Sequence, residues 1–391
     1  MKRKFQKFGG INVILLGIVS LINDFSSEMI IPILPLFITS LGGTSLIIGL
    51  IGGLRESIES ILKVFSGFWS DKIGKRKPFI FTGYLSSSIF KLFLAFSTIW
   101  QHVLIFTGLE RVGKGVRDAP RDALISESMP KQKGKGFGLH RSLDTTGAVL
   151  GSIAVLLILI FFNLTFKNII IIASIIGFFS LIPLFFVKEP KIKPKKIKLS
   201  LSLKQLPKSL KIFIMIGGIF AFANFSYMFF ILKAGLLFEG NIRNAIIFPI
   251  ALYILFNIFY ASLAMPFGKL SDKIGRRKML ITGYLLFSLT CIGFAIFNSL
   301  PAFILLFALY GTSYAIIIAG QKAFVSDLSP SKLRATALGT FDTTIGLIAL
   351  PASLIAGALW IIHPNVTFIF GGLMSLLAVL LFVIFSSYFK N

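Results

Sequence analysis

The sequence predicts an all-α integral membrane protein with twelve transmembrane helices in two six-helix halves. The composition, the apolar segments and an internal repeat support this fold class. Hydrophobic residues make up 55% of the 391 residues, and charged residues make up only 14%. A soluble domain carries roughly a quarter charged residues. This chain therefore has too few charged residues to cover a surface that faces water.

The apolar residues form unbroken runs rather than the alternating pattern of barrel strands, which predicts helices. A membrane-spanning helix needs about 20 mostly apolar residues. Twelve segments qualify: 11–40, 45–65, 78–98, 102–117, 137–162 and 168–187 in the first half, and 212–236, 245–266, 279–297, 301–319, 335–361 and 366–386 in the second.

Two short basic turns repeat one another in the two halves. The first reads Gly67-Phe-Trp-Ser-Asp71-Lys-Ile-Gly74-Lys-Arg76-Lys, and the second reads Gly268-Lys-Leu-Ser-Asp272-Lys-Ile-Gly275-Arg-Arg277-Lys. A period this long indicates two copies of one structural unit, and an even number of helices in each copy makes the repeats parallel. We place the halves at 1–187 and 212–391, with a basic cytoplasmic linker at 188–211.

The chain has a net charge of +25, and the distribution of its basic residues along the sequence indicates membrane topology. Lysine and arginine concentrate in every second connection. By the positive-inside rule, this pattern places both termini in the cytoplasm. We therefore expect a multi-pass protein of the plasma or inner membrane. No polar stretch is long enough for a nucleic-acid domain, so we expect no nucleic-acid partner. The alternating Lys and Ile of 188–211 suit contact with anionic lipids, although a solvated linker explains them equally well.

Charged residues inside the predicted helices of the first half indicate a functional site. Each charge at the bilayer centre costs roughly 2.5–3.5 kcal/mol, so these groups must face one another or a wet cavity. The matching stretches of the second half are almost neutral. We therefore expect the substrate-binding and ion-coupling groups mainly in the first half. The residues in question are Asn23, Asp24, Glu28, Arg55, Glu56, Glu59, Glu110, Arg111, Arg117, Arg121 and Asp144, with Asn224 and Asn257 at the positions matching Asn23 and Glu56.

The deep acids outnumber the deep bases, which predicts proton coupling. A carboxylate without a permanent cationic partner in the membrane takes up a proton or binds a cation. Asp24 and Glu28 lie four residues apart on one helix face and are the best carriers. The predicted groups are Asp24, Glu28, Glu59 and Asp144 for proton or ion coupling; Asn23, Arg55, Arg111, Asn224 and Asn257 for substrate binding; and Glu110, Arg117 and Arg121 as a network in helix four. Lys63, Lys91 and Lys233 are expected to reach the lipid headgroups by snorkelling.

With these turns and spans, the chain resembles the major facilitator superfamily of transporters. The signature of that family between helices two and three is similar to Gly-x-x-x-Asp-x-x-Gly-Arg-Lys, and both basic turns match it. The resemblance implies alternating access by rocking of the halves, with helices one, four, seven and ten lining the cavity. We expect the turns to act as gate latches through Gly67, Asp71, Gly74 and Arg76 and through Gly268, Asp272, Gly275 and Arg277.

Two further motifs bear on the type of transporter. Arg111 followed by Gly115 is similar to proton-driven members of the family. Gly147-Ala-Val-Leu-Gly151 resembles a step of drug/proton antiporters, but Ser152 replaces the proline that would kink the helix. The two glycines would then serve close helix packing.

The sequence therefore predicts a monomeric, proton-coupled secondary transporter of a small organic solute, with export favoured over import. An enzyme is not expected, because the three His residues are far apart in sequence and no catalytic triad is present. With a single cysteine, Cys291, and no metal-ligand spacing, we expect no metal and no cofactor. An organic-anion carrier that uses Arg55 and Arg111 remains an alternative, as does a lipid or amphiphile flippase.

Overall fold

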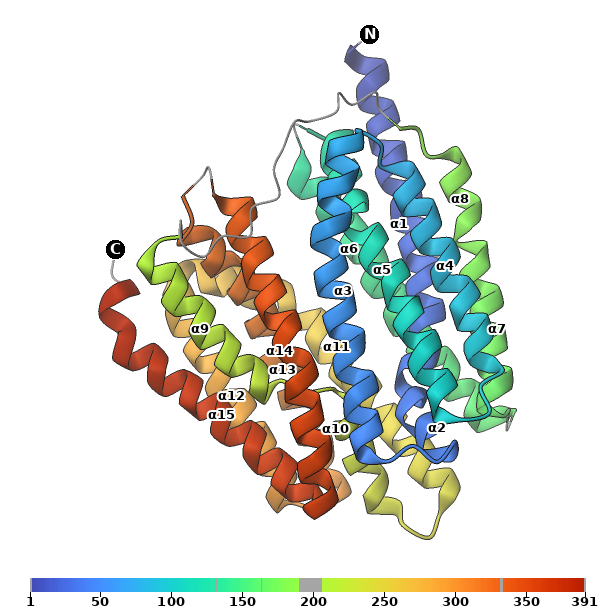
Figure 1. Ribbon diagram of the computed structural model, residues 1–391, viewed down its shortest axis with the longest axis vertical. Coiled ribbons are helices and arrows are strands. Elements are labelled where there is room, and N and C mark those ends of the chain that lie inside the picture. Colours follow the sequence, from blue (N-terminus) through green and yellow to red (C-terminus); the bar gives the residue numbers. More distant parts are fainter. Residues whose placement is uncertain (1, 131, 163, 190–205, 331–332, 390–391) are drawn as a thin grey trace. The chain divides into compact units, whose positions relative to one another are not determined.

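The computed structural model describes residues 2–130, 132–162, 164–189, 206–330 and 333–389, and the regular structure in these ranges is helical (Figure 1). The helices are α1 (Lys2–Ile30), η1 (Ile31–Ile33), α2 (Leu34–Ser40), α3 (Ser45–Ile73), α4 (Lys77–Ala95), α5 (Trp100–Ser128), α6 (Lys133–Phe161), α7 (Phe166–Phe179), α8 (Leu181–Phe186), α9 (Lys208–Ala223), α10 (Met228–Gly235), η3 (Leu236–Phe238), α11 (Ile242–Ile274), α12 (Arg276–Ile296), α13 (Leu300–Asp327), α14 (Arg334–Ile362), α15 (Pro364–Ile384) and η4 (Phe385–Phe389).

Ten segments of the described chain are long and apolar enough to cross a membrane. The predicted spans that fall on α3 and α5 are not among them, although each of these helices has 29 residues. Both helices carry several charged residues in their middle turns, which lowers their hydropathy. The chain is thus a multi-pass helical membrane protein, and the number twelve stays a prediction.

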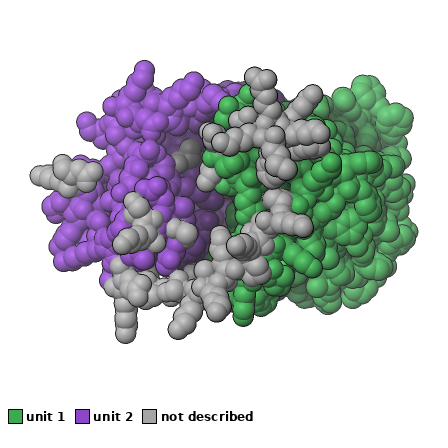
Figure 2. Space-filling view, turned by 90° about the horizontal axis from the view of Figure 1, so that it is seen from above, with its two compact units in different colours: residues 1–42, 58–199 green, residues 43–57, 200–391 purple. Residues whose placement is uncertain are grey.

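The chain divides into two compact units, which Figure 2 shows in separate colours. Unit 1 contains residues 1–42 and 58–199, and unit 2 contains residues 43–57 and 200–391. Helix α3 contributes to both units, because its first part packs within unit 2. Most of the predicted linker, residues 190–205, lies outside the described residues.

Unit 1 is organised by close contact between α1 and α6. A Cβ atom on Gly147 would overlap the backbone oxygen of Leu21, and one on Gly151 would overlap that of Phe25. The two helices therefore approach backbone to backbone, as small residues allow in membranes. This close approach serves the packing role expected for the two glycines, and it brings polar side chains of α1 against α6.

Unit 2 has an aromatic interior. Phe220 of α9 stacks on Tyr284 of α12, with ring centroids 4.2 Å apart. Helices α11 and α13 approach closely at Gly311, where a Cβ would overlap the backbone oxygen of Phe256. The first part of α3 packs on α14 in the same way, and the Ser57 hydroxyl donates a hydrogen bond to the backbone oxygen of Gly346 at 2.5 Å.

The packing of α1 on α6 predicts the effect of one added methyl group. Gly147→Ala should lower the free energy of unfolding by about 1–3 kcal/mol, because the new Cβ meets backbone rather than a flexible side chain. Thermal unfolding of the purified protein in detergent measures the effect. Gly138→Ala in the same helix is the matched control, since a Cβ there meets no neighbouring atom. Equal melting temperatures for the two variants would contradict the contact.

Candidate functional site

A pair of acidic side chains lies between α1 and α6. Ser20, Asp24 and Glu28 follow one another at intervals of four along α1, so they share the face that meets α6. The Ser20 hydroxyl donates a hydrogen bond to Oδ1 of Asp144 at 2.7 Å, and the Ser152 hydroxyl donates to Oε2 of Glu28 at 3.3 Å. The carboxyl group of Asp24 therefore lies near that of Asp144, and the two groups interact electrostatically.

A hydrogen bond between Asp24 and Asp144 would require a proton. Ionised carboxylates only accept hydrogen bonds, so one of the two would have to be protonated to donate. Two ionised carboxylates in this position would also repel each other. Arg141 holds the other oxygen of Asp144, with Nη1 and Oδ2 2.8 Å apart, and its side chain is 63% exposed against 13% for Asp144. The pair can therefore hold one proton beside an exposed cation.

Asn23 links this pair to a buried lysine. Its Nδ2 donates to Oδ1 of Asp24 at 3.2 Å, while its Oδ1 accepts from Nζ of Lys91 at 3.4 Å. Lys91 also donates to the Ser26 hydroxyl at 3.1 Å and is only 3% exposed. The expectation that Lys91 snorkels to the headgroups is wrong, because oxygen atoms of α1 receive its ammonium group. Lys233 is likewise buried, at 5% exposed, and donates to side-chain oxygens of two asparagines.

Glu59 of α3 lies between two cations of α5. Its carboxylate oxygens are 2.7 Å from Nη1 of Arg111 and 3.2 Å from Nζ of Lys114. Arg111 also contacts Glu110, with Nε and Oε2 3.2 Å apart. Glu59 therefore joins α3 to α5 through two ion pairs, and Arg111 contacts two acids.

The next turns of α5 continue this network towards Pro120. The guanidinium group of Arg117 lies 4.1 Å from the centre of the Tyr84 ring, and it donates to the Ser87 hydroxyl at 2.8 Å. Arg121 pairs with Asp118 at 3.2 Å. The site prediction did not include Asp118. The sequence contained a signal for Asp118, because an acid between two arginines in a membrane helix needs partners.

Side chains in and near the first basic turn contact Arg76, which is 1% exposed. Its guanidinium group contacts Asp71, Glu127 at 3.0 Å and the Ser70 hydroxyl at 2.7 Å. Burial by itself would lower the pKa of Arg76, but its hydrogen bonds and charge contacts with Glu127 and Asp71 outweigh burial and raise the pKa above its usual value. Arg76 therefore stays charged.

The start of the linker is fixed to the same turn. The Glu189 carboxylate accepts hydrogen bonds from the backbone N–H groups of Arg76 and, at 3.0 Å, Lys77, so it caps the N-terminus of α4. The Asn12 side chain donates to the backbone oxygen of Lys188 at 2.7 Å and accepts from its N–H at 3.0 Å.

The second basic turn is similar but looser. Arg276, rather than the predicted Arg277, pairs with Asp272 at 3.1 Å and with Asp327 at 2.5 Å. Arg277 instead donates to the backbone oxygen of Ser386 at 3.2 Å. Both turns reverse at a glycine with positive φ, +73° at Gly74 and +94° at Gly275. A Cβ on Gly67 would lie 3.1 Å from Ala119, whereas one on Gly268 would meet no neighbouring atom.

The predicted substrate-binding residues do not gather in one unit. Asn23 and Arg111 belong to unit 1, whereas Arg55, Asn224 and Asn257 belong to unit 2. In unit 2, Arg55 is 4% exposed, and Nδ2 of Asn257 is buried without a hydrogen-bond partner in the described structure. In the ranges that the structure describes, no group of three or more His, Cys, Asp or Glu side chains could hold a metal ion.

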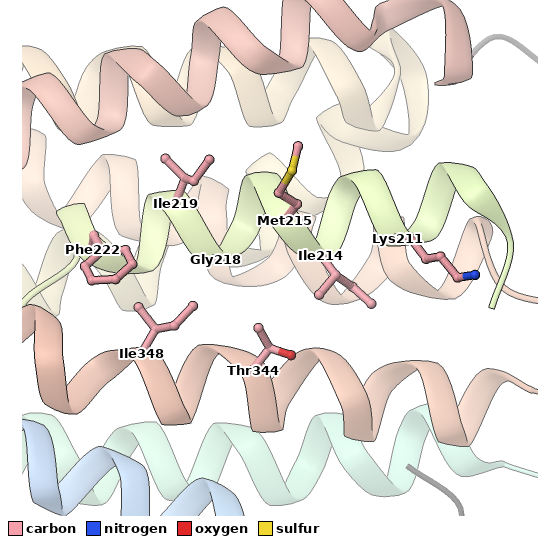
Figure 3. Close-up of a pocket in the computed structure, with 8 residues that line it drawn as sticks. All are labelled: Lys211, Ile214, Met215, Gly218, Ile219, Phe222, Thr344 and Ile348. Carbon is pink, nitrogen blue, oxygen red and sulfur yellow. The ribbon is translucent and has the colours of Figure 1, made fainter. Parts of the chain in front are cut away.

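A separate cavity of about 430 Å³ lies within unit 2 between α9 and α14 (Figure 3). Thr344 and Ile348 point from α14 towards α9, and Lys211 of α9 borders one end of the cavity. The other lining residues are apolar or glycine, and none belongs to the predicted site: Ile214, Met215, Gly218, Ile219 and Phe222.

A helical bundle that pairs buried charges within membrane-length helices is typical of a multi-pass membrane protein. Residues 16–252 and 214–390 match the family model of the Major Facilitator Superfamily. The chain is also 56% identical, over 95% of its length, to an uncharacterised MFS-type transporter of Methanocaldococcus jannaschii, covering 94% of that protein. The chain therefore belongs to the major facilitator superfamily.

Solved transporter structures share the fold at low sequence identity. The nucleoside transporter NupG (D323A mutant) is 15% identical, with a TM-score of 0.78 over 97% of this chain and 100% of that one. A POT family transporter in complex with 5-aminolevulinic acid is 13% identical, with a TM-score of 0.80 over 97% of this chain and 96% of that one. The multidrug resistance protein MdtH of Baumannia cicadellinicola is 31% identical, but over only 32% of this chain and 31% of that protein.

The two basic turns predict unequal losses of stability. Arg76→Ala should lower the free energy of unfolding by about 2 kcal/mol. This loss is smaller than that expected from breaking a fully buried ion pair, because Asp71 and Glu127 keep some contact with water. Arg276→Ala should cost below about 1 kcal/mol, since Arg276 is 28% exposed and its acids are more so. Thermal unfolding in detergent compares the two variants, and an equal or larger loss for Arg276→Ala would contradict the difference.

Proposed function

We propose that the protein is a proton-coupled secondary transporter that exports a small organic solute by alternating access. In this proposal α3 and α5 also span the membrane, which gives twelve spans in two parallel six-helix halves. The observation that carries the proposal is the pair of neighbouring acidic side chains, Asp24 and Asp144, at the close contact of α1 and α6. Neighbouring groups support it, because Ser20, Asn23 and Arg141 hold the two carboxyl groups in place.

The pair offers a simple way to couple a proton to movement. With one proton, Asp24 and Asp144 share a hydrogen bond across the α1–α6 contact. Without it, two carboxylates repel each other in a low-dielectric setting. Gly147, one turn after Asp144, is packed against the backbone of α1, so this repulsion would act beside a backbone-to-backbone contact. Loss of the proton would therefore bias α1 and α6 towards a different packing.

The arrangement of cations weighs against the organic-anion alternative. Glu59 and Glu110 already balance the charge of Arg111, so a substrate anion would have to displace one of them. The surroundings of Asp24 differ from those of Glu59 and Glu110, since its neighbour on α6 is the carboxyl group of Asp144. We therefore assign proton exchange to Asp24 and Asp144, with Glu28 beside them, and ion-pair structure to Glu59, Glu110, Arg111, Arg117 and Arg121.

We also propose the orientation and surroundings of the protein. The basic connections would face the cytoplasm of a plasma or inner membrane, with both termini on that side, and would contact anionic lipids. The Arg76 and Arg276 ion pairs would be the latches that open and close during rocking, since such contacts can break and re-form. We expect a monomer to be sufficient for transport.

Transport by the reconstituted protein tests the function without a known substrate. Proteoliposomes with an acidic lumen would be incubated with a mixture of small organic solutes, and mass spectrometry would identify those that accumulate. We expect at least one solute to accumulate with the protein present, and a protonophore to abolish this accumulation. Accumulation that survives the protonophore would refute proton coupling, and the absence of any transported solute would refute the transporter.

The acid pair makes a sharper prediction. Asp24→Asn and Asp144→Asn should each abolish accumulation driven by the pH gradient, because an amide neither releases nor takes up the proton. Asp342→Asn is the matched control. Asp342 occupies the repeated Asp-Thr-Thr position in unit 2, where it pairs with Lys322 at 3.6 Å. Full coupled transport by either pair variant, or its loss in Asp342→Asn alone, would move the coupling site elsewhere.

A further inference from the structure

Lys91 carries a buried positive charge from α4 to α1. Its Nζ donates at 3.4 Å to Oδ1 and to the backbone oxygen of Asn23, and at 3.1 Å to the Ser26 hydroxyl. These acceptors are neutral, and burying an ammonium group against neutral acceptors costs free energy. A neutral side chain would be enough to join two helices, as where the Ser87 hydroxyl of α4 donates to the backbone oxygen of Glu110 at 3.1 Å. The charge of Lys91 therefore needs a further explanation.

The side chain of Asn23 connects Lys91 to Asp24. Its amide oxygen accepts from Lys91, and its Nδ2 donates to Oδ1 of Asp24 at 3.2 Å. A lysine ammonium group donates hydrogen bonds and never accepts them. The amide must therefore turn its oxygen to Lys91, which leaves its NH₂ group for Asp24. Asn23 is fully buried, so Lys91 rather than bulk water holds the amide in this orientation.

The orientation of the amide matters to the proton on Asp24. An N–H donor stabilises the ionised carboxylate. An amide turned by half a rotation would present its oxygen instead, which repels a carboxylate and accepts a hydrogen bond from a protonated carboxyl group. Compared with a freely turning amide, the fixed one favours release of the proton. Lys91 thus acts on Asp24 through the direction in which Asn23 points.

Charged groups of α5 and α6 also surround this site. The cations among them have other contacts, because they bind Glu59 or an aromatic ring. Helix α7, which packs on both α1 and α4, contributes no titratable side chain after its first turn. The groups of α5 and α6 that interact electrostatically with Lys91 or Asp24 are Glu110, Arg111, Lys114, Arg117 and Asp144.

The internal repeat shows that the lysine accompanies the acid. The repeated Thr-Gly-Tyr-Leu step of the two halves aligns Lys91 with Cys291, and the spacing of the basic turns aligns Asp24 with Phe225. Both replacements border one spot in unit 2, since a Cβ on Gly371 would lie 2.8 Å from a ring carbon of Phe225 and 3.3 Å from Sγ of Cys291. The half without the acid thus also lacks the lysine.

We propose that Lys91 is a positioning residue for proton exchange at Asp24 and that it acts through the side chain of Asn23. This deepens the proposed function, because it names the group that sets the pH range of the coupling acid, and it rests on that function. Lys91 fixes the amide of Asn23, and the amide donates to Asp24. Asp24 then releases its proton at a lower pH than it would beside a freely turning amide.

Infrared spectroscopy of the full chain in lipid nanodiscs tests this role without a solute. The C=O stretch of protonated carboxyl groups is followed against pH, and the band that Asp24→Asn removes is the one to compare. Lys91→Met should raise the midpoint of this band by about one pH unit, which corresponds to one hydrogen bond to a charged group. Asn23→Leu should raise the midpoint by a similar amount, because it removes the donor itself.

A double variant separates positioning from a direct effect of the charge. If Lys91 acts through Asn23, the two substitutions Lys91→Met and Asn23→Leu together should raise the midpoint no further than Asn23→Leu alone. Lys233→Met is the matched control. It removes a buried lysine of unit 2 that also binds side-chain oxygens of two asparagines, at 3.0 and 2.7 Å, and it should leave the midpoint unchanged.

Three outcomes would overturn the positioning role. They are an unchanged midpoint in Lys91→Met, additive shifts in the double variant, and the absence of any band that Asp24→Asn removes. A purely structural lysine would lower the melting temperature and leave the midpoint in place. Lys91→Gln and Asn23→Ala replace variants that fail to fold, and the same shifts are expected of them. A glutamine amide can donate or accept, so it does not fix the orientation of Asn23.

The result is independent of the transport test. If a solute accumulates with the pH gradient while Lys91→Met leaves the midpoint unchanged, the positioning role is overturned and the transporter stands. If the midpoint shifts as expected and no solute is transported, the role of Lys91 at Asp24 stands and the proposed function fails.

Discussion

The cost of placing a charge inside a bilayer governs the architecture of unit 1. An ion in hydrocarbon loses its hydration, and a helix that carries several ions has to give each one a partner. Helix α5 illustrates the outcome, because its cations bind Glu59, Asp118 and the ring of Tyr84. These contacts fix how α5 packs on α3 and α4. The Asp24–Asp144 pair differs, since there an acid lies near an acid and Arg141 contacts only Asp144.

The two units have a common sequence repeat and different interiors. Unit 1 contains most of the charged groups, and its helices meet through glycines and ion pairs. Unit 2 is held by stacked rings, such as those of Phe220 and Tyr284 and of Phe256 and Tyr310. The tighter turn at Arg76 and the looser one at Arg276 show the same divergence.

Much of this could be predicted from the sequence, and the reasons are physical. Composition and long apolar runs predicted a helical membrane protein, the basic turns predicted the family, and both are confirmed. The spacing of Asp24 and Glu28 placed them on one face. The partner of Asp24 could not be predicted, because Asp144 is far away in sequence and only the close approach of α1 and α6 brings it near. Lys91 was misjudged for the same reason.

The carboxylate of Glu189 bears on where the first half of the chain ends. Composition puts that boundary at Val187, where the apolar run stops. Glu189 nevertheless caps α4, and Lys188 forms two hydrogen bonds with Asn12. If the transporter were split into two separately produced polypeptides, a first piece that stopped at residue 187 would leave the start of α4 uncapped and α1 without this tether. A first piece that keeps these contacts extends past the last apolar residue, into what composition alone assigns to the connection.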